Sequence, residues 1–252
     1  TCFFGVPRVY RDLLQASAAS PDPDWKAIRW ACGGAALPDD VSREVAARGG
    51  VVRHGFGMTE TGPTCFLADT DCARRKPGSV GRVQALTDVR LQGVPDGRPG
   101  TGEVLLRGPA ITPGYWNDPE ADAAAFDADG WLRTGDLARR DADGDYFVVD
   151  RLKDMFVSGG ENVWPAEVER VLESHPDVQE AAVVAMPDPR LGEVGHAHLR
   201  PRPGHCIDAA TLSGWCRSRM AGYKVPRRFT VHEDFPRTAS GKIRKAALTK
   251  EP

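Results

Sequence analysis

The sequence predicts an α/β protein in which a large mixed α/β portion with a β-rich subdomain is followed by a small α+β module. Three observations support this prediction: a strand–helix–strand pattern in residues 28–52, a series of short β-type runs in residues 81–149, and alternating helices and strands after residue 151. The length of 252 residues suits one large domain, or a medium domain followed by a small one.

The first of these patterns predicts a parallel sheet. Residues 28–32 are a short apolar run that ends in Gly33-Gly34, which indicates a buried strand and a turn. Pro38-Asp39-Asp40 then begins a helix through Ala47, because proline suits the first helical turn and acidic residues suit the positive end of the helix dipole. Val51-Val52 begins the next strand, so the spacing is that of a βαβ unit.

The remaining predicted elements form two groups with different sequence patterns. Short β-type runs at residues 89–91, 103–106 and 146–149 alternate with Asp/Gly turns, which is typical of a β-rich subdomain. After a boundary near residue 150, we expect the following elements in the small module: a helix over 165–173, a strand over 181–185, a helix over 209–220 and a strand over 225–232. The predicted domains are therefore residues 1–150 and 151–252.

The charge of the chain gives no reason to expect a nucleic-acid or membrane partner, because the formal net charge is −2. The charge is uneven, however. From residue 201 onward there are eleven basic and four acidic residues. This basic end suits an anionic small ligand, and it is also consistent with an ordinary solvated surface.

The six cysteines form no C-x-x-C pair, which favours a reducing, cytoplasmic location. No apolar run reaches the length of a transmembrane helix. The chain opens with Thr1 and not Met, and residues 1–7 resemble the middle of a fold, so we expect a fragment of a longer protein. Composition does not determine the oligomeric state.

Four polar motifs are candidates for chemistry. Residues 55–62 place two glycines before Thr59 and Glu60, a pair that can hold a phosphate oxygen and its Mg²⁺. Residues 131–137 place Asp136 after a Gly turn, where a carboxylate can accept hydrogen bonds from both hydroxyls of a ribose. Each pattern taken alone is more typical of an ordinary polar turn, or of an aspartate that caps one.

The other two motifs lie in the small module. Residues 150–165 contain the turn Ser158-Gly159-Gly160 before the expected helix, and residues 235–245 place Lys242 after a Ser-Gly turn. The second is not a P-loop, because the first glycine is absent and Ile243 stands where that loop has Ser or Thr. Taken alone, these motifs are also consistent with a loop before a helix and with a basic tail.

The order of these motifs resembles the adenylate-forming (AMP-binding) superfamily, and residues 153–169 resemble its acyl-CoA synthetase, or fatty-acid–CoA ligase, branch. The resemblance covers essentially the whole chain. It rests on these segments in sequence order: Thr59-Glu60, residues 102–108, Gly114-Tyr115-Trp116, Arg133-Thr134-Gly135-Asp136, residues 151–162 and Gly241-Lys242. It implies that residues 1–150 are the C-terminal part of a large AMP-binding domain and that residues 151–252 are the small mobile domain.

The resemblance also implies an activity and roles for particular residues. Members activate a carboxylic acid, here expected to be a fatty acid, with ATP and Mg²⁺ and pass the acyl group to coenzyme A. By motif, Thr59 contacts the α-phosphate, Glu60 holds Mg²⁺ and Lys242 bridges the carboxylate and the α-phosphate. The residues expected to line the adenine and acyl pockets or to bind the nucleotide are Gly33, Gly34, Ala35, Gly55, Phe56, Gly57, Asp136 and Arg151.

A second half-reaction is implied for the small module. The family swings this module about a hinge, which falls at Lys153 in this chain, before the coenzyme A thiol attacks the acyl carbon. Ser158, Gly159 and Gly160 are then expected to line the pantetheine tunnel. The family also has a Ser/Thr/Gly-rich phosphate loop upstream of residue 55 that this chain does not contain, so we expect little activity from the chain alone. Phe56 replaces the family's usual tyrosine.

Two alternatives remain open. The first is an adenylation domain that loads a carrier protein, although residues 158–165 differ from the usual pattern of such domains. The second is a non-catalytic fragment that only binds nucleotide. The identity of the acid is not determined, because pocket shape rather than any motif selects it.

Overall fold

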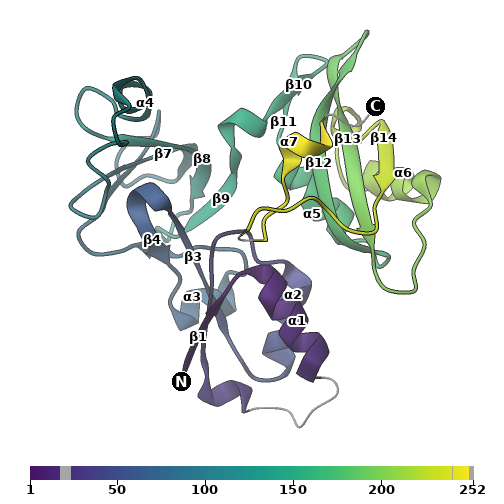
Figure 1. Cartoon of the computed structure of the whole chain (residues 1–252), viewed down its shortest axis with the longest axis horizontal. Helices are drawn as coiled ribbons and strands as arrows, with labels where there is room; N and C mark the ends of the chain where they lie inside the picture. The colour runs from purple at the N-terminus through teal and green to yellow at the C-terminus, as the bar shows by residue number, and fades with distance from the viewer. Residues whose placement is uncertain (18–23, 240, 250–252) are drawn as a thin grey trace. The chain divides into compact units, whose positions relative to one another are not determined.

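The computed structural model describes residues 1–17, 24–239 and 241–249. The chain divides into two compact units, Thr1–Val148 and Val149–Pro252 (Figure 1). Helices accompany several sheets in these units, so the α/β fold class predicted from the sequence is confirmed.

The first unit begins with a five-stranded sheet in the order β1-β2-β3-β4-β5. The bounds of these strands are Cys2–Gly5, Arg29–Cys32, Val52–Met58, Gly62–Leu67 and Arg82–Val83. Strands β1, β2 and β3 are parallel to one another, whereas the β3–β4 and β4–β5 pairs are antiparallel. The predicted βαβ unit is confirmed, because α2 (Asp39–Ala47) connects β2 to β3.

Helices α1 (Pro7–Ser17) and α2 cover the parallel strands with apolar faces. Tyr10 and Leu14 are four residues apart on α1, Val41 and Val45 are four apart on α2, and all four side chains are buried. They pack with Trp25 of η1 (Trp25–Ala27), Trp30 and Val52 in one core cluster. Burying one such side chain is worth about 1.5–3 kcal/mol, so this cluster holds the parallel part of the sheet together.

A second sheet has the strand order β6-β7-β8-β9, with bounds Asp88–Leu91, Gly100–Arg107, Leu132–Arg140 and Tyr146–Arg151. Its last strand begins in the first unit and continues into the second. From Gly102 onward, strand β7 alternates buried and less buried positions, as expected of a sheet with one covered face. Gly81 joins the two sheets, because its carbonyl accepts the Tyr146 N–H at 2.8 Å. Its φ is +72°, and a Cβ there would lie 2.3 Å from Ala68 Cα, so only glycine fits.

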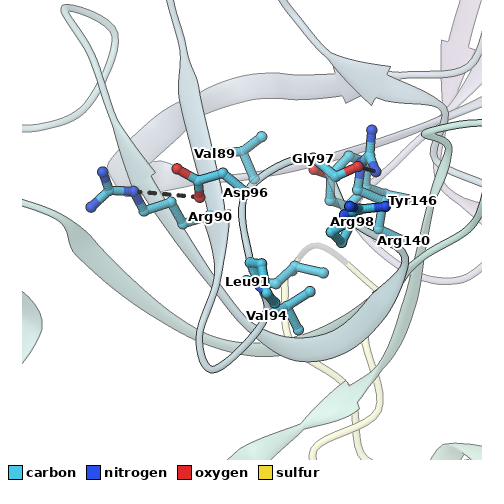
Figure 2. A pocket seen from close by; sticks show the side chains of 10 residues that line it. Val89, Arg90, Leu91, Val94, Asp96, Gly97, Arg98, Arg140 and Tyr146 are labelled. Carbon is cyan, nitrogen blue, oxygen red and sulfur yellow. Dashed lines mark hydrogen bonds and ion pairs between the residues drawn. The ribbon is translucent and has the colours of Figure 1, made fainter.

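Two short helices complete the first unit. Asp69 caps α3 (Thr70–Arg75), and Asp118 caps α4 (Pro119–Ala125), each through a hydrogen bond to a backbone N–H of the first turn. Figure 2 shows a small pocket beside the β6–β7 connection, with a volume of about 20 Å³. Three of its charged side chains have partners within it, since Arg90 pairs with Asp96 and Arg140 donates to the Gly97 carbonyl.

The second unit is built on the long antiparallel pair β12 (Val178–Asp188) and β13 (Gly192–Pro201). The sheet order is β11-β10-β13-β12, and β14 (Arg228–Val231) pairs in parallel with β13. Strands β10 (Phe156–Ser158) and β11 (Glu161–Val163) form a hairpin. The apolar side chains of α5 (Pro165–Glu173) and α6 (Ala209–Arg217) pack in the main core of this unit with Val183, Ala197 and Leu199.

The other face of the β12–β13 pair carries Ala182 and Val184. They pack with Phe235 and with Leu248 of α7 (Lys245–Leu248), the last helix among the described residues. His196 and His198 lie opposite Val184 and Ala182 in the register, and both imidazoles are buried. The C-terminal segment is therefore held by an apolar contact with this face.

Helix α5 has the predicted bounds, whereas two other elements are shorter than predicted. Helix α6 ends at Arg217, not residue 220, because the Cys216 carbonyl accepts the N–H groups of both Arg219 and Met220 and the chain turns there. Strand β14 begins at Arg228, not residue 225, because η4 (Gly222–Lys224) precedes it and Pro226 has no N–H to donate.

Candidate functional site

His54 connects two of the predicted nucleotide-binding segments in the first unit. The loop of Gly33, Gly34 and Ala35 follows β2, and His54 lies on β3, opposite Cys32. The His54 Nε2 atom lies 3.1 Å from the Ala35 carbonyl oxygen, so a neutral imidazole protonated at Nε2 donates this bond. Burial lowers the pKa of His54, which favours that neutral form. The sequence alone assigned no role to this histidine.

The glycines of residues 55–57 have a packing role. Strand β3 runs antiparallel to β4, with a register shift between Phe56 and Met58. A Cβ on Gly57 would lie 2.6 Å from the carbonyl carbon of Pro63, which is closer than any real contact. Gly57 is therefore required by the fold of this hairpin, whatever ligand the segment contacts. The ring of Phe56 contacts that of Phe66, with centroids 5.9 Å apart.

Thr59 and Glu60 lie in η2 (Thr59–Thr61), directly after β3. The Glu60 backbone carbonyl accepts the Thr112 N–H at 2.7 Å, and its carboxylate accepts the Tyr115 hydroxyl at 2.9 Å. The hydrogen bond to Glu60 raises the pKa of Tyr115, because the carboxylate favours the protonated phenol. Residues 112–115 thus fix both the backbone and the side chain of Glu60.

The Glu60 carboxylate has the chemistry required to hold Mg²⁺. This ion takes oxygen ligands and is commonly held by one or two carboxylates together with substrate phosphates and water. Tyr115 contacts Oε1, and Glu60 is partly exposed. Thr59 is exposed beside it and offers a hydroxyl. The residues present therefore fit a magnesium–phosphate group.

Asp136 lies on β8, close to the β3–β4 hairpin. Its side chain is buried, and its backbone N–H donates to the Thr134 hydroxyl at 3.1 Å. Burial raises the pKa of Cys65, and the nearby Asp136 carboxylate adds to that rise. The Cys65 thiol donates to the Phe56 carbonyl at 3.3 Å. Cys65 thus lies near both Asp136 and Phe56, two residues that are 80 positions apart in the sequence.

The other predicted site residues belong to the second unit. Arg151 ends β9, Lys153 lies in η3 (Leu152–Asp154), and both are exposed. The preceding Asp150 is buried, and its carboxylate accepts the N–H groups of Arg151 and Ala166, each at 2.7 Å. Since Ala166 lies in the first turn of α5, Asp150 attaches the segment of the predicted hinge to the start of that helix.

Ser158, Gly159 and Gly160 lie at the turn of the β10–β11 hairpin. The side chain of Ser158 is fully buried, and among the described residues its hydroxyl has no hydrogen-bond partner. Gly159 and Gly160 are exposed, with φ of +61° and +89°, a conformation that favours glycine. The exposed part of this turn is therefore glycine backbone and not the serine side chain.

Lys242 is exposed on a tight loop near the C-terminus. The Lys242 carbonyl accepts the Thr238 N–H at 2.8 Å, and its own N–H donates to the Thr238 hydroxyl at 3.1 Å. An isolated bridge joins Arg237 to Ile243 across the same loop. Residues 237–239 and 241–243 are therefore held together by hydrogen bonds, and the Lys242 side chain is exposed beside them.

Elsewhere in the first unit, a lysine side chain partly neutralises the negative charge of a group of carboxylates. Asp141, Asp143 and Asp145 lie close enough together to suggest a cation site. The Lys76 ammonium contacts all three, at 2.6, 2.8 and 2.6 Å. These hydrogen bonds raise the pKa of Lys76, so its positive charge neutralises part of the acidic cluster.

No helix in the described ranges, 1–17, 24–239 and 241–249, is long and apolar enough to cross a membrane. A cavity of about 350 Å³ lies between α2, β3 and α3. It is lined by Asp39, Ser42, Arg43, Ala46, Gly50, Val51, Val52, Ala73, Arg74 and Pro77. None of the motif residues described above belongs to this lining.

Comparison with known proteins gives matches along the whole chain. Residues 1–116 match the family model described as AMP-binding enzyme, and residues 167–242 match the AMP-binding enzyme C-terminal domain. A feruloyl-CoA synthase of an Amycolatopsis species is 44% identical over 98% of this chain and 51% of its own length. The long-chain-fatty-acid–CoA ligase of Bacillus subtilis is 36% identical over 100% of this chain and 45% of its own length.

Solved structures show the same architecture. The o-succinylbenzoate CoA synthetase MenE of Bacillus subtilis, in complex with an acyl-adenylate intermediate, matches with a TM-score of 0.86 and 34% identity, over 100% of this chain and 51% of that one. ATP-bound MatB of Rhodopseudomonas palustris matches with a TM-score of 0.88 and 32% identity, over 99% of this chain and 50% of that one. The chain thus spans about half the length of the relatives it matches. It belongs to the AMP-binding enzyme family, the adenylate-forming superfamily that the order of its motifs resembles.

Proposed function

We propose that the protein containing this chain is an acid–thiol ligase that uses ATP to convert a carboxylic acid to its acyl-CoA. In the first half-reaction the acid's carboxylate oxygen attacks the α-phosphorus of ATP, and pyrophosphate leaves. In the second half-reaction the coenzyme A thiol attacks the acyl carbon of acyl-AMP, and AMP leaves. The observation that carries this proposal is the 44% identity, over 98% of this chain, with a protein named feruloyl-CoA synthase.

In this proposal the two units contribute different residues to the reaction. Unit 1 is the C-terminal part of the large AMP-binding domain, and unit 2 is the small mobile domain that follows it. The two family-model matches support this division, because they fall at residues 1–116 and 167–242. Lys153, in the exposed η3, is the proposed hinge. The exposed glycines of the Ser158–Gly160 turn line the path of the coenzyme A pantetheine arm.

The nucleotide would lie along residues of unit 1. The Thr59 hydroxyl contacts the α-phosphate, and Glu60 holds a Mg²⁺ that supplies positive charge to the phosphates when bound. The Asp136 carboxylate accepts hydrogen bonds from the ribose hydroxyls. The segments from Gly33 to Ala35 and from Gly55 to Gly57 line the adenine and acyl pockets. The His54–Ala35 hydrogen bond holds these two segments beside each other.

Cations of unit 2 would serve the first half-reaction. The Lys242 ammonium contacts both the substrate carboxylate and the α-phosphate, where negative charge builds up as the new bond forms. Arg151 contacts the nucleotide. The exposure of both side chains is consistent with contact to a ligand. We further propose a cytoplasmic location, which is supported by six free cysteines, four of them buried.

A product screen by mass spectrometry tests this proposal. The full-length protein that contains these 252 residues is incubated with ATP, Mg²⁺, coenzyme A and a panel of acids that includes ferulate, indoleacetate and long-chain fatty acids. Acyl-CoA and AMP formed from one class of acid support the proposal and name the substrate. The absence of acid-dependent AMP with every acid contradicts it and favours a protein that only binds nucleotide.

The molecule that accepts the acyl group from acyl-AMP is tested separately. One solved structure with the same fold, at a TM-score of 0.88 and 32% identity, is an amide bond synthetase from Marinactinospora thermotolerans. The screen is therefore repeated with an amine or with a carrier protein in place of coenzyme A. Acyl-AMP that reacts with one of these and not with coenzyme A overturns the proposed acceptor while leaving the first half-reaction intact.

A further inference from the structure

A partly buried ion pair involves Lys245, three residues after Lys242. The Lys245 ammonium, on the first residue of α7, contacts the Glu169 carboxylate on α5 at 2.7 Å. The same carboxylate oxygen accepts the Val183 N–H of β12 at 2.6 Å. The side chains are only 28% and 16% exposed. The pair therefore joins the C-terminal segment to both α5 and the central strands of unit 2.

Burial disfavours both charges of this pair, and it raises the pKa of Glu169. Burial lowers the pKa of Lys245, but Glu169, and then Asp150 and Asp154, outweigh it, so the net pKa is raised. Asp150 also accepts the Ala166 N–H at the start of α5. The charge of Lys245 therefore acts on both α5 and residues 150–154, the segment of the proposed hinge.

A second partly buried cation, Arg237, contacts the chain on the other side of Lys242. The Arg237 guanidinium contacts Glu180 of β12 at 2.8 Å, and also Asp234 at 3.0 Å. It donates to the Gly241 carbonyl at 3.2 Å, directly before Lys242. Arg237 and Glu180 are 14% and 12% exposed. Two partly buried cations, five residues before Lys242 and three after it, thus attach this segment to the sheet and to α5.

We infer that the Lys245–Glu169 pair is a positioning pair that sets the place of Lys242 for the adenylation step, and that Arg237–Glu180 is its counterpart on the other side of the loop. Lys245 itself touches no substrate in this proposal. The inference rests on the proposed function of Lys242. A displacement of about 1 Å at a reacting group can lower a rate roughly 10²-fold, so loss of one anchor affects the reaction without removing Lys242.

The test compares the two half-reactions in the full-length protein. Acid-dependent ATP–pyrophosphate exchange reports adenylation, and acyl-CoA formation from supplied acyl-AMP reports the second step. We expect Lys245→Met to lower exchange by roughly 10²-fold while thioester formation stays within about threefold. Lys245→Arg retains a cation for Glu169 and should restore most of the exchange rate. Hydrogen exchange of residues 236–244 should rise in Lys245→Met and not in Lys245→Arg.

Two controls separate positioning from stability. Arg244→Met removes an adjacent, exposed cation and should leave both half-reactions unchanged. Because Lys245→Met leaves Glu169 buried without its cation and can unfold the unit, the double variant Lys245→Met/Glu169→Leu is measured as well. We expect it to fold and to show the same selective loss of exchange.

Two kinds of failure remain distinguishable. If the unmodified protein shows no acid-dependent exchange, the proposed function fails before any variant is compared. If the unmodified protein is active and the folded double variant loses neither half-reaction, or loses both equally, the positioning role is overturned.

Discussion

The Tyr115 hydroxyl donates a 2.9 Å hydrogen bond to the carboxylate of Glu60, a residue 55 positions earlier in the chain. The Thr112 N–H holds the Glu60 backbone at the same time. One short segment after β7 therefore orients the residue proposed to hold Mg²⁺, and it leaves the second carboxylate oxygen without a contact to Tyr115.

Tyr115→Phe tests the importance of this orientation. A hydrogen bond of this kind is worth about 1 kcal/mol net, which corresponds to about a fivefold change in an equilibrium constant. We expect the Mg²⁺ concentration for half-maximal pyrophosphate exchange to rise about fivefold, with little change in the thermal midpoint. An unchanged Mg²⁺ dependence in the folded variant would contradict the orienting role.

Lys242→Ala separates the two half-reactions. Since the proposed role of this ammonium is confined to the attack on the α-phosphorus, we expect pyrophosphate exchange to fall about 10²- to 10³-fold. Thioester formation from supplied acyl-AMP should remain near the unmodified rate. Equal loss of both activities would refute the assignment. The side chain is exposed, so the unfolding midpoint should not change.

Lys153→Pro should have the opposite effect. Proline fixes φ and removes the N–H, which restricts the rotation that a hinge at η3 requires. We expect adenylation to continue and thioester formation to fall by roughly 10²-fold. Lys153→Ala is the matched control, because it removes the charge and leaves the backbone free. A normal rate of thioester formation in the proline variant would exclude Lys153 as the hinge.

We expect His198 to make the stability of unit 2 depend on pH. Burial lowers the pKa of His198 to about 4, and His196, His232 and Arg228 add to the shift. In the unfolded chain a histidine takes up its proton near pH 6.5, so the unfolded state binds more protons between pH 6.5 and 4. The stabilisation is complete above pH 6.5 and declines by about 1.4 kcal/mol per pH unit as the pH falls toward 4.

Urea unfolding at pH 7.0 and 5.0 measures this effect. The unmodified chain should lose about 2 kcal/mol more than His198→Gln over this interval, because glutamine does not titrate. His205→Gln serves as the control, since His205 is exposed and pairs with Asp177. Equal losses in the unmodified chain and in His198→Gln would show that His198 does not carry the pH dependence.

Gly81→Ala tests the junction of the two sheets in unit 1. The new Cβ would lie 2.3 Å from Ala68 Cα, so backbone must move, and we expect a loss on the order of 3 kcal/mol in unfolding free energy. Gly78→Ala is a matched control, because its φ of +82° is similar but no atom lies within 4 Å of the new Cβ. That variant should lose only about 1 kcal/mol. Equal losses would assign the effect to backbone conformation alone.

Local sequence patterns predicted the helices and strands whose bounds are determined by nearby residues. Helix α5 has the predicted bounds because Pro165 suits its first turn and because Val168, Val171 and Leu172 follow the helical period. The βαβ unit around α2 was predicted for similar reasons. The errors at α6 and β14 arose where a shared carbonyl and an adjacent 3₁₀ turn changed the hydrogen bonding.

The relationships missing from the sequence analysis are nonlocal. His54–Ala35, Tyr115–Glu60 and Lys245–Glu169 join residues 19, 55 and 76 positions apart, and no local pattern indicates such a pair. Tyr115 lay within a motif segment, and His54 directly preceded one, so adjacency to a motif was the signal available. The assignments of the site residues themselves, including Asp136 and Arg151, stay predictions.

The contact between Gly57 and the Pro63 backbone bears on how this motif would change over evolutionary time. A descendant that no longer used a nucleotide would still need Gly57, because any side chain would force the β3–β4 hairpin apart. Thr59 is exposed and has no such constraint from packing. Thr59 and Glu60 would therefore be replaced first, and Gly57 would remain after nucleotide binding was lost.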